Sequence, residues 1–308
     1  MNIKLPFRLQ RETLPELIRQ LVTEEGAPLC EEYIFEFKTG EEYIDPMGVT
    51  VLHSMITWLL HKKKKVQLGC VEYDETLPNL EEPQRVLDDC GFFELLAGRR
   101  VNSNSALREN TVPLQDVLLD DFTQWLKTSF IPWLSKSLNK SPLEVESFKA
   151  CLEEIFNNVR DHTDIKFSSI FAEYYPEIDS VTIAIGDIGV GIIEHIKSFP
   201  KFAHFSDEEA LRNAVKRNFT TQTTPHNRGA GLDMLIHNVV VNAGGTVYIL
   251  TNRGILESRL ENGHMIQEYS SAKSFYPGTH IEIKIDVSKA EKLFDIVEED
   301  FSWETLSG

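Results

Sequence analysis

The sequence predicts an α/β protein, and strand patterns interleaved with helical patterns are the main observation behind this class. In the first hundred residues, strand-like alternation at 33–38 and 66–71 is separated by an apolar helical stripe. The second half repeats such mixing, with strand patterns at four places: 168–174, 181–186, 245–251 and 280–286. The composition, 42% hydrophobic and 26% charged, is typical of a globular chain that buries a core.

The first hundred residues favour a small α/β unit with an amphipathic helix near 12–22 at its start. Asp45 can cap a helix whose first position is Pro46, because proline lacks only an N–H that is unpaired there anyway. The segment 81–96 reads as a helix that ends near Gly91. The polar stretch 99–110 is rich in turn formers and poor in apolar residues, which indicates a linker.

The second half predicts helices at 113–139 and 144–162 before its first strands. A helical or loop-rich insert follows at 192–228, and a further helix begins near 231. Asn262-Gly263 between alternating arms is a strong hairpin signal, since both residues accept positive φ. The strands therefore follow one another mostly in meander order.

Charge and cysteine usage exclude several classes of protein. The net charge of −17 argues against nucleic acid as a partner, and lysines in the one basic run, 61–65, suit a helix C-terminus. Four scattered cysteines lack zinc-ligand spacing and indicate free thiols of a reducing compartment. With no signal-peptide pattern and no apolar run of membrane-spanning length, we expect a cytoplasmic protein without membrane contact.

The stretch "EEIFNNVRDHT", 153–163, carries a polar stripe on the predicted helix 144–162. At 100° per residue the apolar side chains gather on one side of the helix, and the opposite side carries four polar residues: Glu154, Asn158, Asp161 and His162. Taken alone, such a stripe is most often a solvated face.

Three glycine-containing motifs follow the stripe. "DIGVG" (187–191) ends a β-rich run, and "RGAGL" (228–232) precedes a helix, where backbone N–H groups can approach phosphate oxygens. "GTHI" (278–281) opens the last strand. The second motif lacks the Lys-Ser/Thr of a Walker loop and a preceding strand, so neither a P-loop nor a Rossmann motif fits.

In their order and separation, the helix motif and the three glycine motifs over residues 110–288 resemble the GHKL ATPase superfamily. This group contains gyrase, heat-shock chaperone ATPases, mismatch-repair ATPases, histidine kinases and anti-sigma kinases. The resemblance implies a Bergerat-type α/β sandwich, a mixed sheet covered on one face by helices, with ATP and Mg²⁺ as cofactors.

The resemblance also implies residue roles. Asn158 would hold Mg²⁺ and Glu154 would act as the general base on the attacking water, while Asp187 would accept a hydrogen bond from the adenine amino group. The segment 200–228 would be the ATP lid. The remaining implied ATP-binding residues are Asp161, His162, Gly189, Gly191, Thr223, Thr224, Arg228, Gly229, Ala230, Gly231, Leu232 and Thr279.

Residues 30–98 resemble a STAS-type domain, as found in anti-sigma-factor antagonists. The loop that carries a phosphorylatable hydroxyl in such proteins reads Asp45-Pro46-Met47-Gly48 here, so a docking role is favoured over phosphorylation. A generic α/β packing unit is the alternative. The predicted organisation is a STAS-like unit at 1–100, a linker at 101–110, an ATP-binding domain at 111–288, and a helix and tail at 289–308.

Three functions remain open at this point. The first is a Mg²⁺-dependent ATPase whose nucleotide state moves the lid and changes contacts with a protein partner or a second copy. The second is a Ser/Thr kinase of the anti-sigma kind or a histidine-kinase relative, although His53 lacks the usual phosphoacceptor surroundings. The third is a nucleotide-gated binding module that does not turn over.

Overall fold

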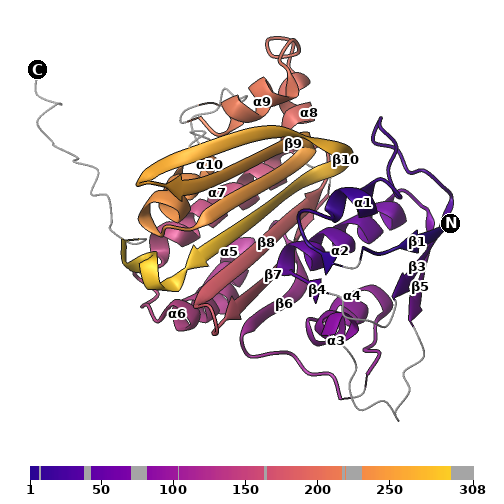
Figure 1. Cartoon of the computed structure of the whole chain (residues 1–308), viewed down its shortest axis with the longest axis horizontal. Coiled ribbons are helices and arrows are strands. Elements are labelled where there is room, and N and C mark those ends of the chain that lie inside the picture. Colours follow the sequence, from indigo (N-terminus) through magenta and orange to yellow (C-terminus); the bar gives the residue numbers. More distant parts are fainter. Residues whose placement is uncertain are drawn as a thin grey trace, which may run out of the picture.

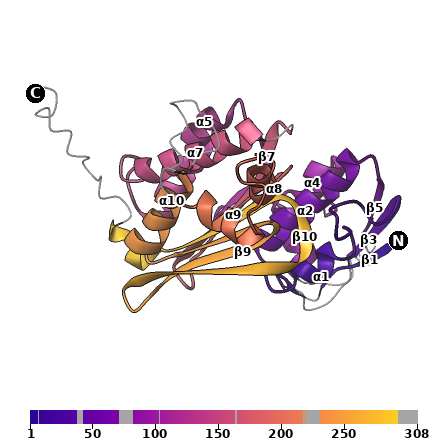
Figure 2. The same cartoon turned by 90° about the horizontal axis from the view of Figure 1, so that it is seen from above.

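The computed structural model describes residues 1–6, 8–37, 43–70, 82–102, 104–162, 165–216, 219 and 231–292. These residues form an α/β protein, as predicted, with a smaller N-terminal unit beside a five-stranded sheet (Figure 1). In the view from above the N-terminal unit occupies one end of the molecule (Figure 2).

Parallel strands form the N-terminal unit. Three of them pair in the order β1 (Asn2–Lys4), β3 (Glu32–Phe37) and β5 (Lys65–Cys70). A second parallel pair joins β2 (Arg8–Leu9) to β4 (Tyr43–Ile44). The helices of the unit are α1 (Leu14–Ile18), α2 (Pro46–His61), α3 (Glu82–Asp89) and α4 (Phe92–Ala97).

Helix α2 begins as the sequence predicts. The Asp45 side chain accepts a hydrogen bond from the Gly48 N–H at 2.7 Å, and Pro46 occupies the first turn. From Pro46 to Leu59 only Thr57 is not fully buried. A helix that is buried on all sides must pack between two layers.

The second layer is a sheet whose strand order is β6-β7-β8-β10-β9. Its strands are β6 (Thr111–Leu118), β7 (Phe167–Tyr175), β8 (Ser180–Ile188), β9 (Thr246–Glu261) and β10 (His264–Asp286). Every pair in it is antiparallel, so the expectation of a mixed sheet is wrong for the described residues. The reason is local: tight turns such as Asn262-Gly263, with φ of 51° and 79°, can join only antiparallel strands.

Helices cover one face of this sheet, as Figure 1 shows behind the strands. They are α5 (Phe122–Trp125), the π-helix η1 (Leu126–Phe130), α6 (Ile131–Leu138), α7 (Glu146–His162), α10 (Gly231–Ile236) and the π-helix η2 (His237–Asn242). The predicted helix at 113–139 is wrong at its start, because 111–118 is strand β6. A bulge between Val112 and Gln115 breaks the two-residue alternation there and hides the strand in the sequence.

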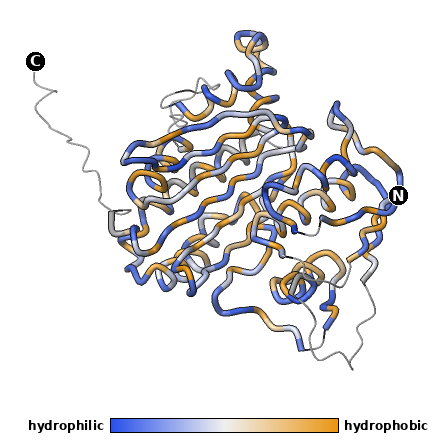
Figure 3. Tube along the Cα trace, viewed as in Figure 1, coloured by the Kyte–Doolittle hydropathy of each residue, from blue (hydrophilic) through white to orange (hydrophobic). Residues whose placement is uncertain are grey.

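The opposite face is also covered in part, which corrects the expectation of helices on one face only. Helix α2 packs on β7 and β8. The hydrophobic cluster around α2 includes Phe171, Ile188, Leu250 and Tyr276 from the sheet. Hydrophobic and hydrophilic residues are mixed along the strands of this sheet (Figure 3). In β10, Ile281, Ile283 and Ile285 of the α7-side core alternate with polar residues.

The predicted insert contains α8 (Ile192–Lys197) and α9 (Asp207–Ala214), and a 3-10 helix η3 (Val287–Lys292) follows the last strand. The rest of the predicted C-terminal helix and tail, 293–308, lies outside the described residues. Within the described ranges, no helix has both the length and the apolar character needed to traverse a bilayer.

Candidate functional site

Helix α7 matches the helix predicted for the polar stripe. Phe148, Leu152, Ile155 and Phe156 are buried in the core that joins this helix to the five-stranded sheet. The stripe residues Glu154, Asn158, Asp161 and His162 lie on the same helix, and their side chains are outside the described residues.

The end of β8 brings Asp187 beside Thr279 of β10, its register partner in the sheet. Ile183 and Ile185, which alternate with Asp187 in steps of two, belong to the core that contains α7. Asp187 and Thr279 therefore belong to the sheet face that α7 covers.

Burial raises the pKa of the Asp187 carboxyl from 3.8 to about 7, and the backbone N–H of Thr279 works in the opposite direction. Among the described residues no cation accounts for this burial of a carboxyl group. Near neutral pH the group is therefore present both as an acceptor-only carboxylate and as a neutral acid.

Glycines pack the turn after Asp187 against Gly278, which lies inside β10 and not at the start of a strand as the sequence predicts. A Cβ at Gly278, whose φ is +137°, would lie 2.1 Å from the carbonyl oxygen of Asp187. A Cβ at Gly191, with φ of +79°, would lie 2.7 Å from the carbonyl oxygen of Gly278. Gly189 donates its N–H to the Pro277 carbonyl at 3.3 Å. The two glycine motifs thus form one packed turn.

Thr251 and Asn252, at the middle of β9, complete this turn and were not predicted from the sequence. The Thr251 hydroxyl accepts a hydrogen bond from Ile192 N–H at 2.8 Å and lies 3.1 Å from the Thr279 hydroxyl. Asn252 donates to the Val190 carbonyl at 2.8 Å. The only sequence signal was an Asn that follows an apolar strand run, a position where Asn accepts positive φ.

The third glycine motif is described only at its end. Gly231 begins α10, which packs against α7, and Leu232 packs against the core of the helix layer. The other predicted phosphate-binding and lid residues lie outside the described residues: Thr223, Thr224, Arg228, Gly229 and Ala230. No group of three or more metal-ligating side chains occurs in the described part of the chain.

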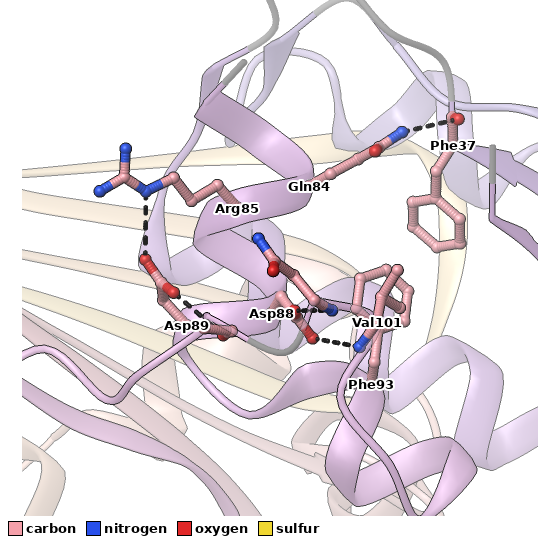
Figure 4. A pocket seen from close by; sticks show the side chains of 9 residues that line it. Phe37, Gln84, Arg85, Asp88, Asp89, Phe93 and Val101 are labelled. Carbon is pink, nitrogen blue, oxygen red and sulfur yellow. Dashed lines mark hydrogen bonds and ion pairs between the residues drawn. The ribbon is translucent and has the colours of Figure 1, made fainter. Parts of the chain in front are cut away.

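A depression lies in the N-terminal unit, between α3 and the predicted linker (Figure 4). Asp88 accepts hydrogen bonds from the backbone N–H groups of Val101 and Asn102, at 2.9 and 2.8 Å. The enclosed space is about 20 Å³, which is room for about one water molecule. These hydrogen bonds attach the predicted linker to α3.

Comparisons with known proteins identify no family for the chain. No family model matches it, and no curated protein matches it. Among solved structures it is similar to the ATPase region of Saccharomyces cerevisiae topoisomerase II bound to ICRF-187 (dexrazoxane), at 16% identity and a TM-score of 0.26. That match covers 52% of this chain and 40% of the other, so this chain spans less than half of that structure. A TM-score at this level carries no argument about the site.

Proposed function

We propose that this protein binds ATP with Mg²⁺ as a member of the GHKL class and hydrolyses it. The observation that best supports the proposal is the buried carboxyl group of Asp187, beside Thr279 on the sheet face that α7 covers. Burying a carboxyl group without a charged partner costs folding free energy. Such groups are common at functional sites, where a bound ligand can supply the missing partner.

The chemistry of Asp187 fits an adenine amino group. A carboxylate has about four acceptor positions, and the Thr279 N–H takes one of them. An exocyclic amino group can donate to another. Guanine carries a carbonyl oxygen at the corresponding ring position, so the same carboxylate repels it and selects adenine.

The phosphate end of the proposed site rests on the sequence resemblance. Asn158 would supply an amide oxygen to Mg²⁺, which neutralises charge on the phosphates, and Glu154 one turn earlier would orient and deprotonate the attacking water. Asp161 and His162 would line the pocket. The 228–232 motif would bring backbone N–H groups to the phosphates at the start of α10.

In the same proposal the N-terminal unit is a STAS-like docking unit. Asp45 occupies the position where STAS regulators carry a hydroxyl, and the Thr50 hydroxyl is buried and donates to the Pro46 carbonyl at 2.8 Å. Neither residue offers an accessible phosphorylation site. The partner of such a unit would be a protein or a second copy of this chain.

A pair of adjacent asparagines tests the proposal. Calorimetric titration with ATP should detect binding that strengthens when Mg²⁺ is added, and Asn158→Ala should remove the Mg²⁺-dependent part. Asn157→Ala is the matched control, because this residue is not on the polar stripe. No heat of binding from folded wild-type protein would refute the proposal, and equal loss in both variants would refute the role of Asn158.

A further inference from the structure

The start of helix α8 lacks a cap of its own. Gly191 precedes the helix and has no side chain, so no local group accepts the first backbone N–H groups. Two side chains from β9 replace the cap. Ile192 N–H donates to the Thr251 hydroxyl at 2.8 Å, and Glu194 N–H donates to Asn252 Oδ1 at 3.2 Å.

The same two side chains also contact the two segments that form the candidate adenine site, the 187–191 turn and residues 278–279 of β10. Asn252 Nδ2 donates to the Val190 carbonyl at 2.8 Å, inside the 187–191 turn. The Thr251 hydroxyl lies 3.2 Å from the Gly278 carbonyl oxygen and 3.1 Å from the Thr279 hydroxyl. Both side chains are buried, with exposed fractions of 0% and 1%.

Asn252 combines a left-handed backbone conformation with side-chain hydrogen bonds to the turn and to α8. Its φ is 51°, in the left-handed region that glycine adopts most easily. Glycine there would remove both side-chain hydrogen bonds and leave the backbone unstrained. The Asn side chain fills the space beside Gly191, where a Cβ would lie 2.5 Å from Asn252 Oδ1.

We propose that Thr251 and Asn252 are positioning residues that fix the 187–191 turn and Thr279 around the base of a bound nucleotide, and so set the preference for adenine over guanine. This inference rests on the proposed ATP-binding function. The two residues do not touch the nucleotide. They act through Asp187 and Thr279, whose relative placement depends on the turn.

A matched pair of Asn→Gly substitutions tests it. Asn262 has the same φ of 51° but lies exposed in the β9–β10 turn. Calorimetric titrations with Mg²⁺-ATP and Mg²⁺-GTP should show that Asn252→Gly weakens ATP binding roughly tenfold and narrows the ATP-to-GTP affinity ratio, since two hydrogen bonds are lost. Asn262→Gly should leave both affinities within about twofold of wild type, as expected for an exposed turn.

The hydroxyl of Thr251 gives an independent test that includes rescue. Thr251→Val removes the hydroxyl at nearly constant volume and should narrow the same affinity ratio, whereas Thr251→Ser keeps the hydroxyl and should restore it. A general loss of stability would lower the affinities for ATP and GTP together and leave their ratio unchanged.

The outcomes separate this inference from the proposed function. If wild type binds ATP, and Asn252→Gly and Thr251→Val discriminate between ATP and GTP as wild type does, the positioning role is overturned while ATP binding stands. If wild type binds no nucleotide, both proposals fail. If Asn252→Gly does not fold, the Thr251→Val and Thr251→Ser pair decides the question alone.

Discussion

The two faces of the five-stranded sheet carry their polar groups in different places. On the face covered by α7, the interior is largely apolar, and buried polar groups meet where Asp187, near the end of β8, lies beside Thr279 of β10 and Thr251 of β9. On the face covered by α2, polar groups lie along the strands. His53 of α2 contacts Asp116 at 2.9 Å, and Ser169 donates to the same carboxylate at 2.6 Å.

This difference teaches how the two faces are used. Polar groups that pair across two packed layers fix how the layers dock, whereas a buried acid without a cation among the described residues costs stability and is typical of a binding site. The N-terminal unit therefore covers the α2 face of the sheet, and the proposed nucleotide would bind on the α7 face.

The largest expected effect concerns the α7 face. Glu154→Ala should keep ATP binding but lower the rate of phosphate release by roughly 10²- to 10⁴-fold, because the substitution would remove the proposed general base. Glu153→Ala is the control, since Glu153 pairs only with Lys149, at 3.8 Å, among the described ion pairs. Equal turnover in Glu154→Ala and wild type, measured by phosphate release, would exclude Glu154 from the reaction.

The second prediction concerns the α2 face. Leu52 is fully buried between α2 and its neighbours, so Leu52→Ala should lower the free energy of unfolding by about 2–5 kcal/mol. Urea unfolding should be followed with single-tryptophan variants that retain Trp58 in α2 or Trp125 in α5. Both probes should shift together if the two covers fold as one unit. A shift at Trp58 alone would mean that the N-terminal unit unfolds independently.

The third prediction uses pH to compare Asp187 on the α7 face with Asp116 on the α2 face. Because the pKa of Asp187 is raised to about 7, its contribution to stability is complete below about pH 4 and is lost as the pH rises through 7. Asp187→Asn should therefore stabilise the nucleotide-free protein at pH 8, by on the order of a few kcal/mol, and change little at pH 4.

Asp116 should respond with the opposite sign. Burial acts to raise its pKa, but hydrogen bonds from His53 and Ser169 outweigh burial and lower the pKa. Its stabilising effect is present above the ordinary carboxyl pKa and is lost on acidification, so Asp116→Asn should destabilise the protein at pH 8. Urea unfolding of both variants at the two pH values measures this, and the same sign for both would contradict the opposite environments of Asp187 and Asp116.

The smallest expected effect compares two neighbouring serines. Ser169→Ala removes a hydrogen bond to a carboxylate on the α2 face and should cost about 1–2 kcal/mol of unfolding free energy. Ser168, on the other face, donates to the Gly186 carbonyl at 3.0 Å, and Ser168→Ala should cost less because that acceptor is a neutral backbone oxygen. If Ser168→Ala lowered the urea midpoint more than Ser169→Ala, the hydrogen bonds around Asp116 would not be important for the packing of α2 on the sheet.

The sequence predicted much of the fold because strong local signals coincide with the elements. The cap at Asp45, the strands at 168–174 and 181–186 and the Asn262-Gly263 turn are confirmed, since each depends on neighbouring residues. The start of the 113–139 helix was wrong because a bulge at Val112 disturbed the strand alternation. The packing of α2 on the opposite face of the sheet depends on contacts between residues far apart in the sequence, which hydrophobic periodicity does not predict.

The candidate site was predictable only where its residues form short motifs. Asp187, Gly191 and Thr279 lie within such motifs, and the structure brings them together where the end of β8 meets the interior of β10. Thr251 and Asn252 were missed because they act on residues about sixty positions away, at Val190 and Ile192. The roles of Glu154 and Asn158 remain predictions that rest on the sequence resemblance.

One titration tests the central claim most directly, using two buried aspartates with similar pKa values on opposite faces. Burial raises the pKa of both Asp187 and Asp45 to about 7. Wild type and Asp45→Asn should bind Mg²⁺-ATP in preference to Mg²⁺-GTP, and Asp187→Asn should lose that preference. If Asp187→Asn keeps the wild-type preference, or if folded wild type binds neither nucleotide, the account of this sheet face as an ATP site is contradicted.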